Sequence, residues 1–342
     1  MALAKSSLII TTIGSLNKAL TEFGVLCAAS DVEFLVIGDK KTKPELGGLF
    51  SEYQKSTGFR GAFYSADQQL SLPFRTVKEL PFNHYTRKNL GYLLAIRNGA
   101  EMITETDDDN YPESNYGFTF SRDVTGPVVA HHGWVNTYKY FTKEHIWPRG
   151  FPLDLITTAV PSPCTAQKVH SPVQQYLANR NPDVDAVYRL VINKELNFNS
   201  LPANIVLDEN AWCPFNSQNT VWFREAFPLL YLPSTCSFRM TDIFRSYVAQ
   251  RLLWTFGARL SFGNASVYQD RNEHSLIRDF QDEISGYLND KKIIRILSEI
   301  ELKNGVENLP ENLLRCYRAL VQGEILKETE LPILDAWLED LR

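Results

Sequence analysis

The chain has 342 residues, of which 44% are hydrophobic, 12% aromatic and 22% charged, and its formal net charge is −5. This composition is typical of a globular protein, either one large domain with an extension or two domains. The negative charge argues against a nucleic-acid partner, which would favour a basic stripe. No apolar run approaches the ~18–20 residues of a membrane span, so we expect no transmembrane segment, while peripheral contact with a membrane stays open.

The N-terminus lacks the long apolar core of a signal peptide, and its first apolar run is better explained as a strand. The chain contains five widely scattered cysteines, which form neither a CxxC pair nor a zinc-binding spacing. Free thiols in a reducing compartment are the default for such a pattern. We therefore expect a cytoplasmic protein.

The first part of the chain predicts a parallel βαβ unit. Residues 8–13 form an apolar run closed by a glycine, a helical pattern follows to Leu26, and residues 34–37 form a second apolar run. Strand, helix and strand in this order are typical of a nucleotide-binding α/β domain. No GxGxxG follows the first strand and no GxxxxGK[ST] occurs, which disfavours a classical dinucleotide site or P-loop. Residues 44–83, which contain several glycines and prolines, are expected to be rich in loops.

A helix is expected over residues 86–98, with Gly99 as its C-cap. Arg87 and Lys88 lie in its first turn, where cations oppose the helix dipole. The free N–H groups of the same turn are suited to bind an anion. Two interpretations of these cations stay open: contact with a phosphate, or a solvated surface.

This helix leads into three consecutive carboxylates, Asp107, Asp108 and Asp109. Clustered like charges raise one another's pKa, so the cluster must be fully solvated or must hold a cation. The lead-in at residues 100–103 predicts a short strand, and ligands of open α/β sheets bind beyond the carboxyl ends of strands. Mg²⁺ and Mn²⁺ bind there through one or two carboxylates plus substrate phosphates. A metal–diphosphate site and a solvated acidic loop both remain open.

The second half of the chain adds one arginine and one aspartate to the candidate site. The loop at residues 146–153 combines two prolines, a glycine and two aromatic residues around Arg149. Such a rigid loop can hold a guanidinium against a diphosphate or a carboxylate, or Arg149 can bind backbone carbonyls. A strong helix is expected from residue 242 to 255, and Asp242 at its start can be a simple cap. Residues 276–342 show only helical periodicity and charge, which predicts an α-helical C-terminal extension.

Several blocks between residues 70 and 275 resemble the STELLO glycosyltransferase-like family and, more distantly, the UDP-arabinopyranose mutases (reversibly glycosylated polypeptides). The blocks are LPFNHYTRKNLGYLLAI (80–96) followed by the acidic cluster, WPRGFPL (147–153), PDVD (182–185), PFNS (214–217) and QRLLW (250–254). Both families imply a GT-A fold, an α/β Rossmann-like mixed sheet flanked by helices that binds a nucleotide-diphosphosugar. We therefore expect a GT-A domain over residues 1–275 and a helical extension over residues 276–342.

The resemblance also implies roles for individual residues. The acidic cluster takes the place of the DxD motif, in which Asp107 and Asp109 would bind Mn²⁺ or Mg²⁺ and Asp108 would face the sugar or the sheet. His274 matches a His-Ser pair of the mutases and would be the last metal or diphosphate ligand. Asp109 departs from the plant STELLO proteins, which have arginine at this position.

The remaining site residues are expected to surround this metal. Thr11, Thr12 and Asp39, at the ends of the first two strands, would hold the base and ribose. The diphosphate would be bound by Arg87, Lys88 and Arg149. Arg149 falls on the mutase arginine associated with self-glycosylation. Asp242 matches an acidic position typical of the acceptor side of this fold.

The expected function is metal-dependent transfer of a sugar from a nucleoside-diphosphate sugar, with a UDP-sugar favoured, to a hydroxyl of a glycan or glycoconjugate. Asp242 would deprotonate the acceptor in an inverting reaction, or would position the acceptor or stabilise an oxocarbenium-like centre in a retaining one. Two alternatives stay open: a mutase-like or self-glycosylating enzyme that uses Arg149, and a non-catalytic GT-A scaffold. The helical C-terminus is a candidate surface for an oligomer.

Overall fold

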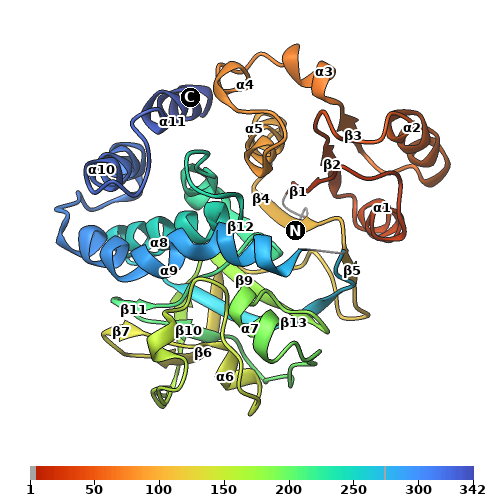
Figure 1. Ribbon diagram of the computed structural model, residues 1–342. Coiled ribbons are helices and arrows are strands. Elements are labelled where there is room, and N and C mark those ends of the chain that lie inside the picture. Colours follow the sequence, from red (N-terminus) through yellow and green to blue (C-terminus); the bar gives the residue numbers. More distant parts are fainter. Residues whose placement is uncertain (1–4, 273–274) are drawn as a thin grey trace.

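The computed structural model describes residues 5–272 and 275–342, and within them the chain is organised around one mixed eleven-stranded sheet (Figure 1). The strand order is β3-β2-β1-β4-β12-β9-β13-β10-β6-β8, with β5 paired to β13. The strands of this sheet are β1 (Ser6–Thr11), β2 (Glu33–Ile37), β3 (Gly61–Tyr64), β4 (Met102–Asp107), β5 (Asn110–Pro112), β6 (Asp123–Val129), β8 (Ala166–His170), β9 (Val173–Asn179), β10 (Ile205–Leu207), β12 (Asn219–Phe223) and β13 (Leu260–Gln269). A separate short ladder joins β7 (Gly133–Trp134) to β11 (Ala211–Trp212).

The strands β3, β2, β1 and β4 are parallel, so their carboxyl ends share one edge of the sheet. Helices α1 (Lys18–Ser30) and α2 (Leu46–Thr57) contribute to the hydrophobic cluster on one face, and α5 (Lys88–Arg97) contributes to the cluster on the other face. Leu8 and Ile10 join the first cluster, whereas Ile9 between them joins the second. Covering both faces explains why these strands are continuous apolar runs. The predicted βαβ unit is confirmed.

Residues 44–83, expected to be rich in loops, contain more regular secondary structure than predicted. The segment holds α2, β3 and two short helices, α3 (Ala66–Leu70) and α4 (Thr76–Glu79). Two of its four glycines lie at element boundaries: Gly58 ends α2 with φ +79°, and Gly61 starts β3 so close to β2 that a Cβ atom would lie 1.9 Å from the Phe34 carbonyl oxygen. These two glycines therefore end α2 and permit the close approach of β3 to β2.

Strand β4 marks the point where the sheet changes from parallel to mixed. It pairs in parallel with β1 on one side and antiparallel with β12 on the other. The second half adds helices α6 (Tyr138–Phe141), α7 (Ala186–Val191) and α8 (Thr241–Leu253). Short 3-10 helices occur as η1 (Tyr85–Arg87), η2 (Leu153–Leu155), η3 (Arg224–Leu230), η4 (Phe238–Met240), η5 (Trp254–Phe256) and η6 (Val306–Asn308).

The C-terminal segment is helical, as expected, with α9 (Leu276–Glu299), α10 (Leu309–Gln322) and α11 (Glu330–Asp340). These helices pack on α8, η3 and α4, and their buried residues belong to the same hydrophobic cluster as α5 and α8. We propose that residue 275 separates the sheet-containing part of the chain from the helical extension, and that the two parts share one hydrophobic core. The expected α/β class, a mixed sheet flanked by helices and followed by a helical extension, is confirmed, while its GT-A type stays a prediction. In the described part of the chain, no helix is long and apolar enough to cross a membrane.

Candidate functional site

The carboxyl ends of β1, β2 and β4 bring five predicted site residues together. The Thr42 hydroxyl donates to the Thr12 carbonyl at 2.8 Å and accepts from the Asp39 backbone N–H at 2.7 Å. The Thr12 hydroxyl donates to the Asp108 carboxylate. Thr11, the last residue of β1, lies in register with Asp107. These contacts join the predicted nucleoside residues to the acidic cluster.

A pocket of about 460 Å³ opens beyond the ends of β2 and β3. Asp39, Lys40 and Lys43 line it together with the ring of Phe63. Ligand pockets of proteins typically measure ~300–1,000 Å³ and combine apolar walls with a few polar groups. This pocket is therefore large enough for a nucleoside.

The three aspartates of the acidic cluster have different partners. Asp107 accepts from the Tyr85 hydroxyl at 2.7 Å and from Lys88 Nζ at 3.4 Å. Asp109 accepts from Gln269 Nε2 at 3.1 and 3.2 Å, while Asp108 lies against β1 through its bond from Thr12. Burial raises the pKa of all three carboxyl groups, and with the charge of Asp107 it raises the pKa of Asp109 to about 7.

These carboxylates fit a divalent cation. Within residues 5–272 and 275–342, no three His, Cys, Asp or Glu side chains form a closed metal cage. Mg²⁺ needs no such cage, because one or two carboxylates and substrate phosphates hold it. Burial raises the pKa of Asp107 and Asp109, so a cation beside them would favour their ionised forms, and both carboxylates are donors available for a metal. The third expected ligand, His274, lies outside the described residues.

Arg87 and Lys88 are both buried, so the solvated-surface interpretation is wrong for both. Lys88 Nζ donates to the Tyr85 hydroxyl at 2.7 Å and to the Thr106 carbonyl at 2.9 Å, which fixes the end of β4. Arg87 donates to Gln69 at 2.8 Å and packs over the Phe82 ring, and burial lowers its pKa to about 10. Arg87 is thus held away from the carboxylates, whereas Lys88 is fixed beside Asp107.

Arg149 is clamped between two carboxylates. Its Nε and Nη2 atoms donate to Asp183 at 2.8 Å each, and its Nη1 and Nη2 atoms donate to Asp242 at 3.0 Å each. Nη1 also donates to the Arg239 carbonyl. Burial alone would raise the pKa of Asp242, but the adjacent Arg149 guanidinium lowers it to about 2. Two interpretations of this rigid loop were open, in which Arg149 binds a carboxylate or diphosphate, or binds backbone carbonyls. In the structure Arg149 binds two carboxylates and also one backbone carbonyl.

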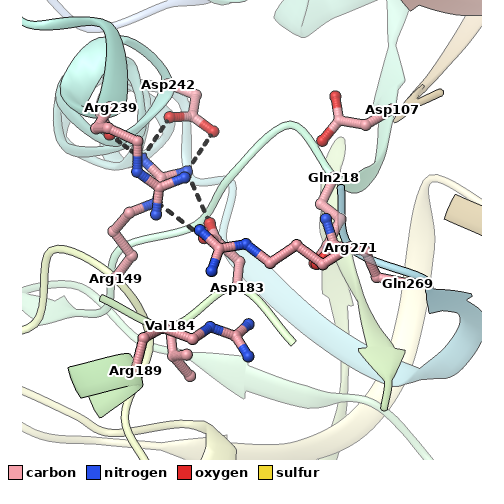
Figure 2. A pocket seen from close by; sticks show the side chains of 10 residues that line it. All are labelled: Asp107, Arg149, Asp183, Val184, Arg189, Gln218, Arg239, Asp242, Gln269 and Arg271. Atoms are coloured by element: carbon pink, nitrogen blue, oxygen red, sulfur yellow. Dashed lines mark hydrogen bonds and ion pairs between the residues drawn. The ribbon is translucent and has the colours of Figure 1, made fainter. Parts of the chain in front are cut away.

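A second pocket, of about 70 Å³, lies between Asp107 and this clamp (Figure 2). Asp107 and Gln218 line one side of it. Three arginines that sequence reasoning missed also line the pocket: Arg189 and Arg239 on the side of the clamp, and Arg271, which extends from the side of Gln218 towards the clamp. They come from α7, η4 and the segment after β13, so no local spacing connects them. Asp183 was detectable only as part of the PDVD block.

Beneath the acidic cluster, Glu105 is completely buried. Its carboxylate accepts from Arg245 at 2.7 and 3.2 Å and from the indole N–H of Trp222 at 2.8 Å, and Tyr92 also donates to it. Glu105 and Asp107 point to the same face of β4 because they lie two positions apart on the strand. The network fixes the strand that carries the candidate metal ligands.

Comparisons with known proteins agree with the expected resemblance. A family model described as STELLO glycosyltransferases matches residues 239–342, which hold mostly the C-terminal helices and include the QRLLW block but none of the other blocks quoted above. The chain is 28% identical over 309 residues to the probable glycosyltransferase STELLO2 of Arabidopsis thaliana, which covers 84% of this chain and 40% of the relative. It is 27% identical over 300 residues to the probable glycosyltransferase STELLO1 of the same plant, covering 82% and 38%.

The chain thus spans about 40% of the length of these curated relatives. Among solved structures, it is similar to the crystal structure of GalNAc-T7 with UDP, GalNAc and Mn²⁺, with a TM-score of 0.41 and 12% identity, over 85% of this chain and 48% of that one. The resemblance to STELLO glycosyltransferases is confirmed by the family model and by both plant relatives.

Proposed function

We propose that this chain is a metal-dependent glycosyltransferase that moves a sugar from a nucleoside-diphosphate sugar, a UDP-sugar being favoured, to a hydroxyl of a glycan or glycoconjugate. One observation carries the proposal: the partly exposed carboxylate of Asp107 and the buried carboxylate of Asp109 lie at and just beyond the end of β4, between a nucleoside-sized pocket and an arginine-lined pocket. The likeness to relatives named probable glycosyltransferases supports it.

Each part of this edge has a proposed task. Thr11, Thr12 and Asp39 hold the nucleoside beyond β1 and β2. Asp107 and Asp109 hold Mn²⁺ or Mg²⁺, which neutralises charge on the leaving diphosphate when it is bound. Lys88 orients the Asp107 carboxylate, and its buried ammonium group adds positive charge behind it.

The pKa of Asp242 favours an electrostatic role over a basic one. A general base works best when its pKa lies near the operating pH, whereas the pKa of Asp242 is lowered to about 2. A carboxylate that stays ionised and is held by Arg149 and Ser217 is suited to position an acceptor or to stabilise developing positive charge. We therefore favour the positioning role among those expected for Asp242.

The self-glycosylating alternative is disfavoured by the geometry of Arg149. A guanidinium has five N–H donors, and Arg149 makes five hydrogen bonds, to Asp183, Asp242 and the Arg239 carbonyl. A nitrogen engaged in this way must leave the clamp before it can attack a sugar. That alternative works without an external acceptor, so it is refuted if Arg149→Lys leaves transfer to an added acceptor intact.

We further propose a cytoplasmic setting, supported by five unpaired cysteines. Oligomer formation through the helical C-terminus also remains a proposal. It is supported by the exposed apolar side chains of Ile277, Ile284 and Leu288 on α9.

A thermal-shift screen of UDP-, GDP- and CMP-sugars, each with and without Mn²⁺, tests the proposed function. We expect the sugar of one nucleotide to raise the unfolding temperature, and to do so only when Mn²⁺ is present. A ligand that binds the folded state stabilises the protein against unfolding. Asp109→Ala should abolish that stabilisation, and Asp154→Ala, at an exposed surface pair with Lys291, should preserve it. A flat screen for the unmodified chain would favour the scaffold. Survival of metal-dependent binding in Asp109→Ala would refute the assigned metal ligands.

A further inference from the structure

Four arginines line the small pocket between Asp107 and α8, and three of them have a carboxylate partner. Arg149 is bound by Asp183 and Asp242. Arg239 pairs with Glu283 at 2.8 Å, and Arg271 pairs with Asp279 at 2.7 Å. The fourth, Arg189, makes no ion pair with any described residue: it donates to the Asn181 side chain at 3.0 Å and to the Pro182 carbonyl at 2.7 Å.

Arg189 is a buried cation in an unfavourable environment. Only 4% of its surface is exposed, and its Nε atom has no hydrogen-bond partner in the described part of the chain. The nearby carboxylate of Asp183 uses both oxygens to accept from Arg149. Burial, together with the positive charges of Arg271 and Arg239, lowers the pKa of Arg189 to about 10 despite the attraction of Asp183. Burying a charge without a paired partner typically costs several kcal/mol, so an anion in this pocket would offset that cost.

The position of the pocket indicates which part of the substrate would supply this anion. In the sheet order, β1, β2 and β3 lie on one side of β4, and β12, β9 and β13 lie on the other. The nucleoside-sized pocket belongs to the first side, while Arg189 on α7 and Arg271 after β13 belong to the second. The diphosphate is proposed to lie at Asp107 and Asp109, between the two. A group that reaches Arg189 is therefore beyond the diphosphate, on the sugar and acceptor side.

We propose that Arg189, Arg239 and Arg271 bind an anionic group, a carboxylate or a phosphate, on the sugar or acceptor that reacts at this site, so that the substrate is an acidic sugar. The inference rests on the proposed function and narrows its substrate class. Guanidinium groups bind carboxylate and phosphate oxygens through paired, charge-assisted hydrogen bonds. The pocket of about 70 Å³ exceeds the ~10–15 Å³ that one water needs by several times, which leaves room for one such group.

The test measures binding of three monosaccharides by calorimetry in the presence of saturating UDP and Mn²⁺. Glucuronate carries a carboxylate, glucose 6-phosphate carries a phosphate, and glucose is the neutral control. We expect at least one acidic sugar to bind and glucose not to bind. Arg189→Gln and Arg271→Gln should each lower the affinity for that acidic sugar by about tenfold or more. Arg60→Gln, at an exposed pair with Asp31, should leave its affinity unchanged.

The two acidic probes distinguish a carboxylate site from a phosphate site, and binding of either supports the inference. Equal binding of glucose and both acids, or full affinity in both Gln variants, would overturn it. A parallel loss of UDP–Mn²⁺ affinity in the variants would also overturn it, because the arginines would then hold the donor diphosphate. Arg271 is 14% exposed in its side chain, so Arg271→Gln carries the test if Arg189→Gln does not fold. Failure of the proposed function is distinct: the unmodified chain would then not bind UDP with Mn²⁺ at all.

Discussion

Replacing Glu105 by glutamine removes the negative charge at the centre of the buried network beneath the acidic cluster. In the folded protein, Arg245 lies 2.7 Å and Lys88 lies 3.9 Å from its carboxylate, and the three side chains are 0–1% exposed. Glutamine keeps the size of the side chain but leaves both cations without this counter-charge. Removing one partner of a buried ion pair typically costs ~3–5 kcal/mol. We therefore expect Glu105→Gln to lower the free energy of unfolding by about 3–5 kcal/mol.

Urea unfolding followed by tryptophan fluorescence measures this change, with Glu101→Gln as the matched control. Glu101 precedes β4 and pairs with Arg224 at 2.6 Å, but both side chains are exposed, so its loss should change stability by at most about 1 kcal/mol. Adding Arg245→Met to Glu105→Gln should recover part of the lost stability, because it removes one orphaned cation. The reasoning is refuted if Glu105→Gln stays within about 1 kcal/mol of the unmodified chain, or if Arg245→Met destabilises it further.

Three further changes test other parts of the structure. Gly150 has φ +86°, and a Cβ there would lie 2.4 Å from Ile243 Cγ2, so Gly150→Ala should destabilise by about 2–4 kcal/mol in urea; a neutral result would contradict the steric conflict expected at this glycine. Burial raises the pKa of Asp185 to about 7, above the ~3.9 of an unfolded chain. The folded state therefore binds the proton of the Asp185 carboxyl group more tightly than the unfolded chain does. The free energy of unfolding, relative to that of Asp185→Asn, should fall as pH rises from about 4 to 7, by up to about 1.4 kcal/mol per pH unit. A difference between the urea midpoints of the two proteins that does not change with pH would exclude this. Glu330, buried on α11, accepts from the Ser234 backbone, so Glu330→Ala should speed protease cleavage near α11, and an unchanged fragment pattern would count against this docking role.

The fold could be predicted where long apolar patterns decide the structure. The βαβ unit, the helix at residues 242–255 and the C-terminal helices all have clear periodicity. Residues 44–83 could not be predicted because four short elements are separated by glycines and prolines, which are typical of loops as well as of element boundaries. The close approach that requires a glycine at Gly61 becomes visible only once β2 lies beside it.

The site could be predicted where its chemistry is local. Asp107 to Asp109 follow one strand, so a strand-end carboxylate cluster was visible in sequence. The partners of Arg149 were not, because Asp183 and Asp242 are 34 and 93 residues away along the chain. Arg87 shows the converse: a cation in a helical first turn resembles a surface residue until tertiary packing buries it. Local patterns therefore found the carboxylates, whereas the arginine-lined pocket depends on distant contacts.

The contact between α11 and α4 has a consequence for the way the chain folds during synthesis (Figure 1). Asp340 accepts from the backbone N–H groups of Arg75 and Thr76 at 2.8 Å each, across more than 260 residues of sequence. Domains generally begin to fold from the N-terminus as they leave the ribosome, and contacts between distant residues form slowly. The two N–H groups at the start of α4 therefore lack the Asp340 carboxylate until residue 340 has left the ribosome. The N-terminal half of the chain, which carries the nucleoside-sized pocket, thus reaches its final structure late.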